Sequence, residues 1–526
     1  MGDSSDRTGY TYGSVHRPLE PGSGGCHPDQ GGAGGGVIHI EATGTVLING
    51  TVSADGQAYR SSQFGGGGSG GSVLIECDTL EGGGRVTARG GSGGSSGGAG
   101  GGGRIAVHYA SCGGAWPGLR FDTAPGSSGY ATTVKRFTGQ PGTLWLSDTA
   151  ILTSGLTPGR LTDVVVHFGS GATWPVASLN VNSNQFRIGT AGFAVEATGD
   201  VVIDRSARLD VPNLFCAGSL LVTNGGILRI HADPTNLPHA YGGYLAVTQD
   251  VTITTESTLE IESHETNGAT PLIRAERVRI AKDGTLSGYG LGLTTAGGGL
   301  QSGTDGQRRA SGGHGGMGSR GEYSSQAGGG RPVGTPTEPS VGGGGCLAGA
   351  GGWGGALIVI EADIVELAGT VNVNGAQNGE AYGGGGAGGG VHIVCRTLTG
   401  APTGLISANG GNGSSTCGGA GGGRIALFYE TATPWPGIRF SCSPGSGRSN
   451  PHPFEPDQGT LYLADAAALA NSLDDNRFRD VTLFVGDLPG WSAATLDIGN
   501  CAFRFGATGF VVSVTGDLRV DGGRFG

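Results

Sequence analysis

Several acidic residues recur at matching places in two parts of the chain, and their side chains could bind a cation or transfer protons. Asp200 and Asp204 match Asp517 and Asp521. Paired carboxylates can act as general acid and base, and carboxylate oxygens are the ligands that Ca²⁺ prefers. An aspartate at a strand edge more often caps a turn with its side chain. We therefore expect turn formation, with Ca²⁺ as a weak alternative and no other cofactor. The further carboxylates retained in both parts are Glu41 with Glu361, Asp148 with Asp465, and Asp163 with Asp480.

Tryptophan also recurs, Trp116 with Trp435 and Trp174 with Trp491. An exposed aromatic ring can stack on a sugar ring, so these four side chains are candidates for carbohydrate contact. Packing over the end of the core is the more common use of a repeated tryptophan.

The nine cysteines are too few for a disulfide-rich scaffold. Cys26 and Cys77 match Cys346 and Cys395, which suggests one bridge within each pair in an oxidising compartment. Buried thiols are an equally weighted alternative. Asn49 and Asn412 begin glycosylation sequons, which matter only if the chain is secreted in a eukaryote.

A polysaccharide-cleaving site like that of the pectin hydrolases is not supported by the motifs present. Those enzymes carry the motifs NTD, DD, GHG and RIK in that order. This chain has GHG at 313–315 before DD at 474–475, and it has neither NTD nor RIK. The histidines are scattered, with no metal-site spacing. We interpret His314 as a lone histidine in a glycine run and expect no catalytic residue.

These recurrences belong to an internal repeat with a period of about 318 residues. The segment VIHIEATGTVLINGTVSADGQ (37–57) matches LIVIEADIVELAGTVNVNGAQ (357–377), and GGAGGGGRIAVHY (97–109) matches GGAGGGRIALFY (418–429). Both ends of the chain fall inside a repeat unit, so we expect a fragment of a longer array, and the missing secretion signal then carries no information. The expected segments are glycine-rich 1–104, strand-rich 105–298, glycine-rich 299–424, and a truncated strand-rich 425–526.

The apolar residues between the glycine runs alternate with polar ones. From Ile38 to Ala54 the apolar positions other than Leu47 are even, which predicts strands with one buried face. Short strands separated by Gly, Asp and Asn turns favour an all-β fold of parallel β-helix or β-solenoid-like rungs, with tandem β-sandwiches as the alternative. The 114 glycines are either flexible linkers or extended polyglycine segments packed on one another, and we favour the packed segments.

Charge and hydropathy exclude several partners. The net charge is −11 and no run of basic residues occurs, which argues against a nucleic-acid partner. No apolar stretch is long enough to form a membrane span within this chain.

The glycine and strand motifs together resemble a repeat family of very large cell-surface and secreted adhesin-like proteins. The matching pieces are GGHGG (312–316), GTVSADG (50–56), GTVNVNG (369–375), LISANGG (405–411) and GGGGRIAV (100–107). The resemblance implies an extracellular, non-enzymatic structural or adhesive protein, with surface glycans or other cell-surface proteins as partners. A carbohydrate-binding or polysaccharide-degrading β-helix is the alternative.

Overall fold

The chain forms two compact units in the computed structural model. Unit 1 comprises Met1–Glu196 with Ile203–Val211, and unit 2 comprises Ala197–Val202 with Pro212–Gly526. Each unit is described by itself. The structure describes residues 11–525 apart from 27–29, 61–63, 113–115, 129–138, 157, 235–240, 295–310, 320–328, 346–350, 378–382, 415–416, 433, 448–454, 475–476, 501 and 523.

Unit 1 is built from short and medium strands. Its strands are β1 (Val37–Glu41), β2 (Thr45–Leu47), β3 (Thr51–Ser53), β4 (Ser72–Glu81), β5 (Arg85–Thr87), β6 (Arg104–Ser111), β7 (Arg120–Asp122), β8 (Gly142–Leu146), β9 (Leu161–Phe168), β10 (Thr173–Val176), β11 (Leu179–Asn182), β12 (Gln185–Ile188) and β15 (Arg208–Val211). Two further strands, β13 (Ala194–Ala197) and β14 (Val201–Asp204), have residues assigned to both units.

Unit 2 repeats this composition over a longer stretch of chain. Its strands are β16 (Asn213–Cys216), β17 (Leu220–Val222), β18 (Ile227–His231), β19 (Gly243–Val247), β20 (Asp250–Ile253), β21 (Thr258–Glu262), β22 (Pro271–Ile280), β23 (Thr285–Ser287), β24 (Leu357–Leu367), β25 (Thr370–Asn372), β26 (Gly390–Gly400), β27 (Leu405–Ser407), β28 (Arg424–Thr431), β29 (Arg439–Ser441), β30 (Gly459–Leu463), β31 (Ser472–Asp474), β32 (Phe478–Arg479), β33 (Val481–Val485), β34 (Gly490–Ala493), β35 (Leu496–Gly499), β36 (Ala502–Phe505), β37 (Val511–Val514), β38 (Leu518–Asp521) and β39 (Arg524–Phe525). Within the described part of the chain there is no helix of the length and apolar character that crossing a membrane requires.

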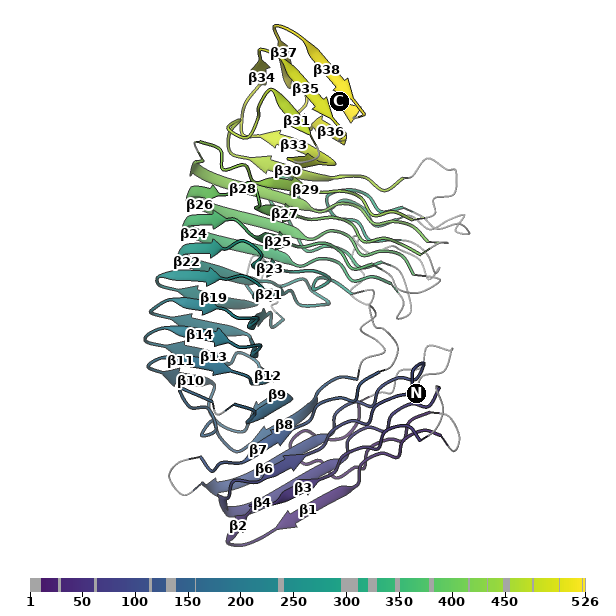
Figure 1. Ribbon diagram of the computed structural model, residues 1–526, viewed down its shortest axis with the longest axis vertical. Coiled ribbons are helices and arrows are strands. Elements are labelled where there is room, and N and C mark those ends of the chain that lie inside the picture. The colour runs from purple at the N-terminus through teal and green to yellow at the C-terminus, as the bar shows by residue number, and fades with distance from the viewer. Residues whose placement is uncertain are drawn as a thin grey trace. The chain divides into compact units, whose positions relative to one another are not determined.

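The strands pair in parallel, each with the corresponding strand one turn of chain further on. In unit 1, β1, β4, β6, β8, β9, β12 and β15 stack in this order. In unit 2, the longest stack is β16, β19, β22, β24, β26, β28, β30, β33, β36 and β39. Figure 1 shows the strands of each unit lying side by side. Parallel stacking confirms the solenoid-like prediction, and the alternative of β-sandwiches is wrong because those are built from antiparallel sheets.

The expected period-two burial is present. Val46, Ile48 and Ala54 are buried, while Leu47 between the first two is 60 % exposed. In unit 2 the inward residues include Phe440, Phe478 and Phe503, which stack in successive turns at ring-centroid separations of 5.9 and 5.5 Å. A continuous apolar stripe therefore forms the core of each unit.

The glycine runs are ordered and hydrogen-bonded. In unit 1 the run after β5 leaves the sheet and returns to β6, so that Gly103 N–H donates to Ala88 O at 2.7 Å within the run. Gly70 N–H donates to Gly101 O at 2.9 Å between consecutive runs. In unit 2, Gly423 N–H donates to Ala408 O at 2.7 Å in the same way. Each rung, meaning one turn of chain, adds strands to the sheets, and the rungs around β1–β8 and β24–β30 also add two arms to a glycine layer.

Close backbone packing explains why these residues are glycine. A methyl group added at Gly100 would lie 2.0 Å from Gly68 O, and one added at Gly423 would lie 2.1 Å from Gly389 O. Real Cβ contacts are essentially never shorter than 3.0 Å. The hydrogen bonds between arms offset the conformational entropy that glycine loses on ordering.

The Asp or Asn in the motifs SADG, NVNG and SANG joins one rung to the next. Asp55 Oδ1 accepts a hydrogen bond from Arg89 N at 2.7 Å in unit 1. In unit 2, Asn374 Oδ1 accepts from Asn409 N at 2.6 Å, and Asn409 Oδ1 accepts from Ser443 N at 2.7 Å. A short acceptor side chain is therefore used where a strand passes into a glycine arm.

An extended segment, here called the strap, crosses the outer face in each unit; its residues are 11–24 in unit 1 and 332–344 in unit 2. Arg104 Nη2 donates to Tyr12 O at 2.6 Å, and Arg424 Nε donates to Val333 O at 2.9 Å. The arginine that ends each glycine run in GGGGRIAV and GGGRIAL thereby holds the strap. A glycine arm and the strands on either side of it belong to the same rung. The two compact units therefore each contain both glycine-rich and strand-rich chain, whereas the four expected segments separated these two kinds of chain.

Candidate functional surface

The acidic residues considered for Ca²⁺ are used locally. Asp200 Oδ1 accepts from Ser219 N at 2.8 Å, as expected for a turn-capping carboxylate. Asp204 pairs with Arg205 at 3.6 Å and Asp521 with Arg519 at 2.9 Å, while Asp517 is exposed. Over the residues that the structure describes, the group with metal-site geometry consists of other side chains, which are taken up below.

The other retained carboxylates are also engaged. Asp148 accepts from the Tyr109 hydroxyl at 2.6 Å, and Asp465 accepts from Tyr429 at 2.7 Å. Burial, followed by the bond to the carboxylate, raises the pKa of both tyrosines well above its ordinary value. Each pair buries a neutral phenol that donates to an acceptor, which is a structural arrangement repeated in both units.

Asp163 and Asp480 occupy left-handed backbone positions, with φ of 43° and 51°. Aspartate tolerates this conformation at turns. Asp163 lies inside β9, where the pairing with β12 skips one residue, whereas Asp480 lies between β32 and β33. The turn expected of repeated aspartates is therefore found at Asp480, and a β-bulge takes its place at Asp163.

The four tryptophans offer little surface to a sugar. Trp174 is 1 % exposed and packs near Phe186, with ring centroids 6.5 Å apart, so carbohydrate contact at this residue is excluded by burial. Trp116 packs against Tyr109 and Phe121, and Trp435 makes the matching contacts in unit 2. Trp491 is half-buried on β34.

The Cys26–Cys77 bridge is not formed, because Cys77 carries a thiol. Cys26 lies beside Gly66 in the glycine layer, where a Cβ on Gly66 would be 3.2 Å from its sulfur. Cys77 lies further along the same extended chain, on β4, roughly 35 Å away at about 3.2 Å per residue. A disulfide needs Cα atoms within about 7 Å. Cys395 is also a thiol, and burial raises its pKa to about 12. Its expected partner Cys346 lies outside the described residues. The side chains of the aspartate pair at 474–475, considered above as a catalytic motif, are likewise outside the described part of the chain.

The two sequons differ in accessibility. Asn49 is exposed at a turn, and its Oδ1 accepts from Gly83 N at 3.2 Å. Asn412 is half-buried, and its Oδ1 accepts from Ser446 N at 2.7 Å.

His314 is fully buried inside the glycine layer of unit 2. Its Nδ1 lies 2.9 Å from Gly388 O, and its Nε2 accepts a hydrogen bond from Ser340 N at 3.0 Å. Burial, with a smaller effect of the Arg424 charge, lowers the pKa of His314 to about 3. The neutral imidazole thus connects the layer to the strap and faces no solvent.

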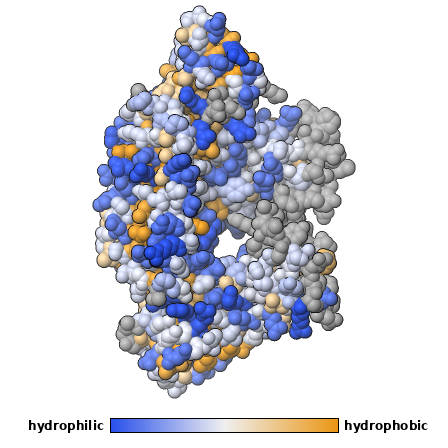
Figure 2. Space-filling view, in the orientation of Figure 1, coloured by the Kyte–Doolittle hydropathy of each residue, from blue (hydrophilic) through white to orange (hydrophobic). Residues whose placement is uncertain are grey.

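The outer face of unit 2 carries a cluster that the sequence reasoning missed. Phe215 on β16 and Tyr244 on β19 are each 39 % exposed, and their rings stack at 6.4 Å. Tyr241 meets Tyr244 edge-on at 6.1 Å. We call these three residues, with Arg274 and Glu361, the aromatic–ionic patch. Figure 2 shows apolar surface interspersed with polar surface over the face in view.

The ionic half of the patch comes from adjacent strands. Arg274 on β22 is in register with Glu361 on β24, and its Nε donates to the carboxylate at 3.0 Å. Burial and the charge of Glu361 raise the pKa of Tyr241, so the tyrosine lies within the influence of this pair. Exposed aromatic rings can stack on the apolar face of a sugar ring. A nearby guanidinium and carboxylate can donate hydrogen bonds to, and accept them from, the hydroxyl groups at the edge of that ring. The outward phase of the period-two pattern was the signal that could have found Phe215 and Tyr244.

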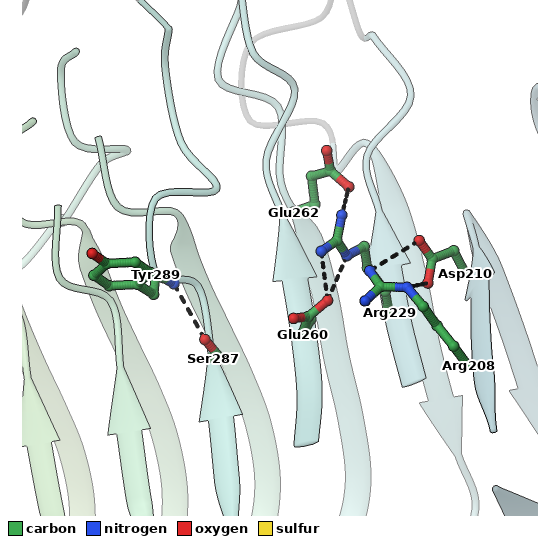
Figure 3. A network of polar contacts seen from close by, with 7 residues as sticks. All are labelled: Arg208, Asp210, Arg229, Glu260, Glu262, Ser287 and Tyr289. Carbon is green, nitrogen blue, oxygen red and sulfur yellow. Dashed lines mark hydrogen bonds and ion pairs between the residues drawn. The ribbon is translucent and has the colours of Figure 1, made fainter. Parts of the chain in front are cut away.

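A second ionic cluster in unit 2 is structural in character. Arg229 is 13 % exposed and donates to Glu260 at 2.7 Å and to Glu262 at 2.9 Å (Figure 3). The Arg229 guanidinium is paired with both carboxylates of the adjacent strand β21. Arg274 is more exposed than Arg229.

A scan against protein-family models, a search of curated proteins and a search of solved structures found no match to this chain.

Proposed function

We propose that the protein is a non-enzymatic structural repeat protein that acts outside the cell and presents a long, regular β surface. The observation that carries this proposal is the glycine layer, in which successive runs bond to one another as the strands do. Each rung that carries glycine arms is then held by hydrogen bonds in the sheets and again in the layer. A fold in which a large part of the backbone is held by hydrogen bonds between rungs suits a mechanical or adhesive role. The resemblance of the sequence to adhesin-like repeats supports the same proposal.

The location is tested on intact cells that make the protein, using a non-permeant protease and an antibody to unit 1. We expect the protein to be cleaved while a cytoplasmic marker remains intact. Full protection until the cells are lysed would overturn the extracellular proposal.

Glycan binding at the aromatic–ionic patch is a second candidate function. The stacked, exposed rings of Phe215 and Tyr244 favour it, since an exposed aromatic pair beside an ion pair is suited to sugar rings. The ligand would be a surface glycan, and the patch would supply the adhesive contact of the structural protein.

Affinity electrophoresis of the full chain through gels containing different polysaccharides tests this second function. Where a polysaccharide retards the wild type, Tyr244→Ala should weaken binding by about tenfold, through lost stacking. Tyr289→Ala is the matched control, because Tyr289 is 42 % exposed in the turn after β23, a strand of a different sheet, and its loss should not affect binding. Equal loss in both variants, or no retardation by any polysaccharide, would refute glycan binding at this patch.

A further inference from the structure

Three metal-ligating side chains converge on the outer face of unit 1. His39, Glu41 and Glu76 each offer one ligand atom, and all three atoms lie within 4.8 Å of one another. His39 Nε2 is 2.7 Å from Glu76 Oε2. His39 and Glu41 are exposed and Glu76 is half-buried, so an ion in solution can reach the group.

The strand register fixes this convergence. His39 and Glu41 are two residues apart on β1, so their side chains leave the same face of the strand. Glu41 lies directly opposite Glu76 on β4. Neighbouring parallel strands are only about 4.8 Å apart, so the backbone itself holds the three side chains together.

Surrounding groups orient the ligands without occupying the position between them. Arg17 of the strap contacts the other carboxylate oxygen, Glu76 Oε1, at 3.4 Å, which leaves Oε2 turned toward His39. His108 lies opposite Glu76 on β6, but its Nε2 is engaged with His16 O at 2.7 Å. The hydrogen bond from His39, followed by weaker charge effects, lowers the pKa of Glu76. Outer contacts of this kind commonly fix ligand orientation in metal sites.

The second repeat shows that the fold does not need this group. The matching residues on β24 and β26 are Val359, Glu361 and Val394, with Glu361 and Val394 in register. There the remaining carboxylate is paired with Arg274. The same parallel strands therefore form with valine at two of the three positions.

We propose that unit 1 binds one Zn²⁺ ion through His39 Nε2 and one carboxylate oxygen each from Glu41 and Glu76. An imidazole with two carboxylates suits zinc, whereas Ca²⁺ takes oxygen ligands alone. A tetrahedral ion with bonds of about 2.0–2.2 Å holds its ligand atoms roughly 3.4 Å apart, so the 2.7 Å hydrogen bond between His39 Nε2 and Glu76 Oε2 must open and His39 must bind through an unprotonated Nε2. Rotation of the exposed Glu41 side chain brings in the third ligand. Three protein ligands leave a fourth position for water. The ion would tie β1 to β4 and is independent of the function proposed above.

Isothermal titration of the full chain with ZnCl₂, after alkylation of the cysteines, tests the site. We expect one ion per chain. His39→Val and Glu76→Val introduce the residues of the second repeat, and each should weaken affinity more than about 100-fold, because losing a ligand exceeds the loss of an outer contact. His264→Gln, a histidine of unit 2, is the control that should leave binding unchanged.

Two further readouts separate a lost ligand from a lost fold. Circular dichroism of both valine variants should match the wild type, and bound Co²⁺ should give a tetrahedral absorption spectrum in the wild type alone. Zn²⁺ should also slow amide exchange in β1. Absence of binding to the wild type, or unchanged affinity in both valine variants, would overturn the proposal, the latter result meaning an adventitious ion only.

Discussion

Replacing Gly103 by alanine is expected to disrupt the glycine layer of unit 1, whereas the same change at Gly98 is expected to be harmless. A methyl group at Gly103 would lie 2.1 Å from Gly71 O and 2.6 Å from the Gly70 carbonyl carbon, and neither backbone atom can move alone. At Gly98 no atom lies within 4 Å of the added methyl group. We expect Gly103→Ala to lower the free energy of unfolding by on the order of 3 kcal/mol or more, as severe overpacking does.

Gly98→Ala should instead raise the free energy of unfolding by about 0.4–1 kcal/mol, because alanine restricts the unfolded chain. Two substitutions of the same chemistry, five residues apart in one arm, then change the free energy of unfolding in opposite directions. Hydrogen exchange of peptides from the glycine layer measures both effects, and peptides of unit 2 serve as the internal reference. If both variants exchanged alike, the run would be a flexible linker and not a packed layer.

Acidification is expected to weaken unit 2 through His314. In the unfolded chain a histidine has a pKa near 6.5, whereas in the folded chain burial lowers the pKa of His314 to about 3. Between these values the unfolded state binds a proton that the folded state excludes. The free energy of unfolding should therefore fall with pH by roughly 1.4 kcal/mol per unit below pH 6.5, and this group should have no effect above it.

His314→Gln isolates this contribution from other titrating groups. The variant loses a buried hydrogen bond and should be about 1–3 kcal/mol less stable at pH 7. Guanidinium unfolding at pH 7, 6, 5 and 4, followed by exchange of unit 2 peptides, should show the gap to the wild type closing as pH falls. A gap that stayed constant over this range would mean that His314 is not held neutral by the fold.

The sequence predicts where the strands lie and which face of each is buried, but it does not predict which strands pair with one another. Alternation from Ile38 to Ala54 gave the buried face directly, because side-chain direction in a strand has a period of two. It could not give the aromatic–ionic patch, because Phe215 and Tyr244 come together only once the pairing of β16 with β19 is known. That register depends on the length of the connection between the strands, which composition does not determine.

The chemistry of the repeated residues was only partly readable for a related reason. Trp116 and Trp435 recur because they pack on Tyr109 and Tyr429. Recurrence alone does not show whether a side chain lies on the buried or the exposed face of a strand. Glu41 was noted as a retained carboxylate, but its grouping with His39 and Glu76 was missed because the ligand spacing runs across two strands and not along the chain. His314 was recognised as a histidine in a glycine run, yet its two bonds to the layer and the strap are visible only in three dimensions.

The glycine layer also constrains how such a protein can diverge. At positions such as Gly423 and Gly355 every replacement adds at least a methyl group, which would lie about as close to a carbonyl oxygen as at Gly100. Point substitution is therefore a poor route to variation there, while a change in the length of an arm only moves its turn. The arms that run from Ala88 to Arg104 and from Ala408 to Arg424 have the same length, and the glycines nearest the sheet are kept in both copies. Sequence drift in this layer should therefore spare the positions of closest backbone contact and concentrate at the arm tips and on the outward faces of the strands.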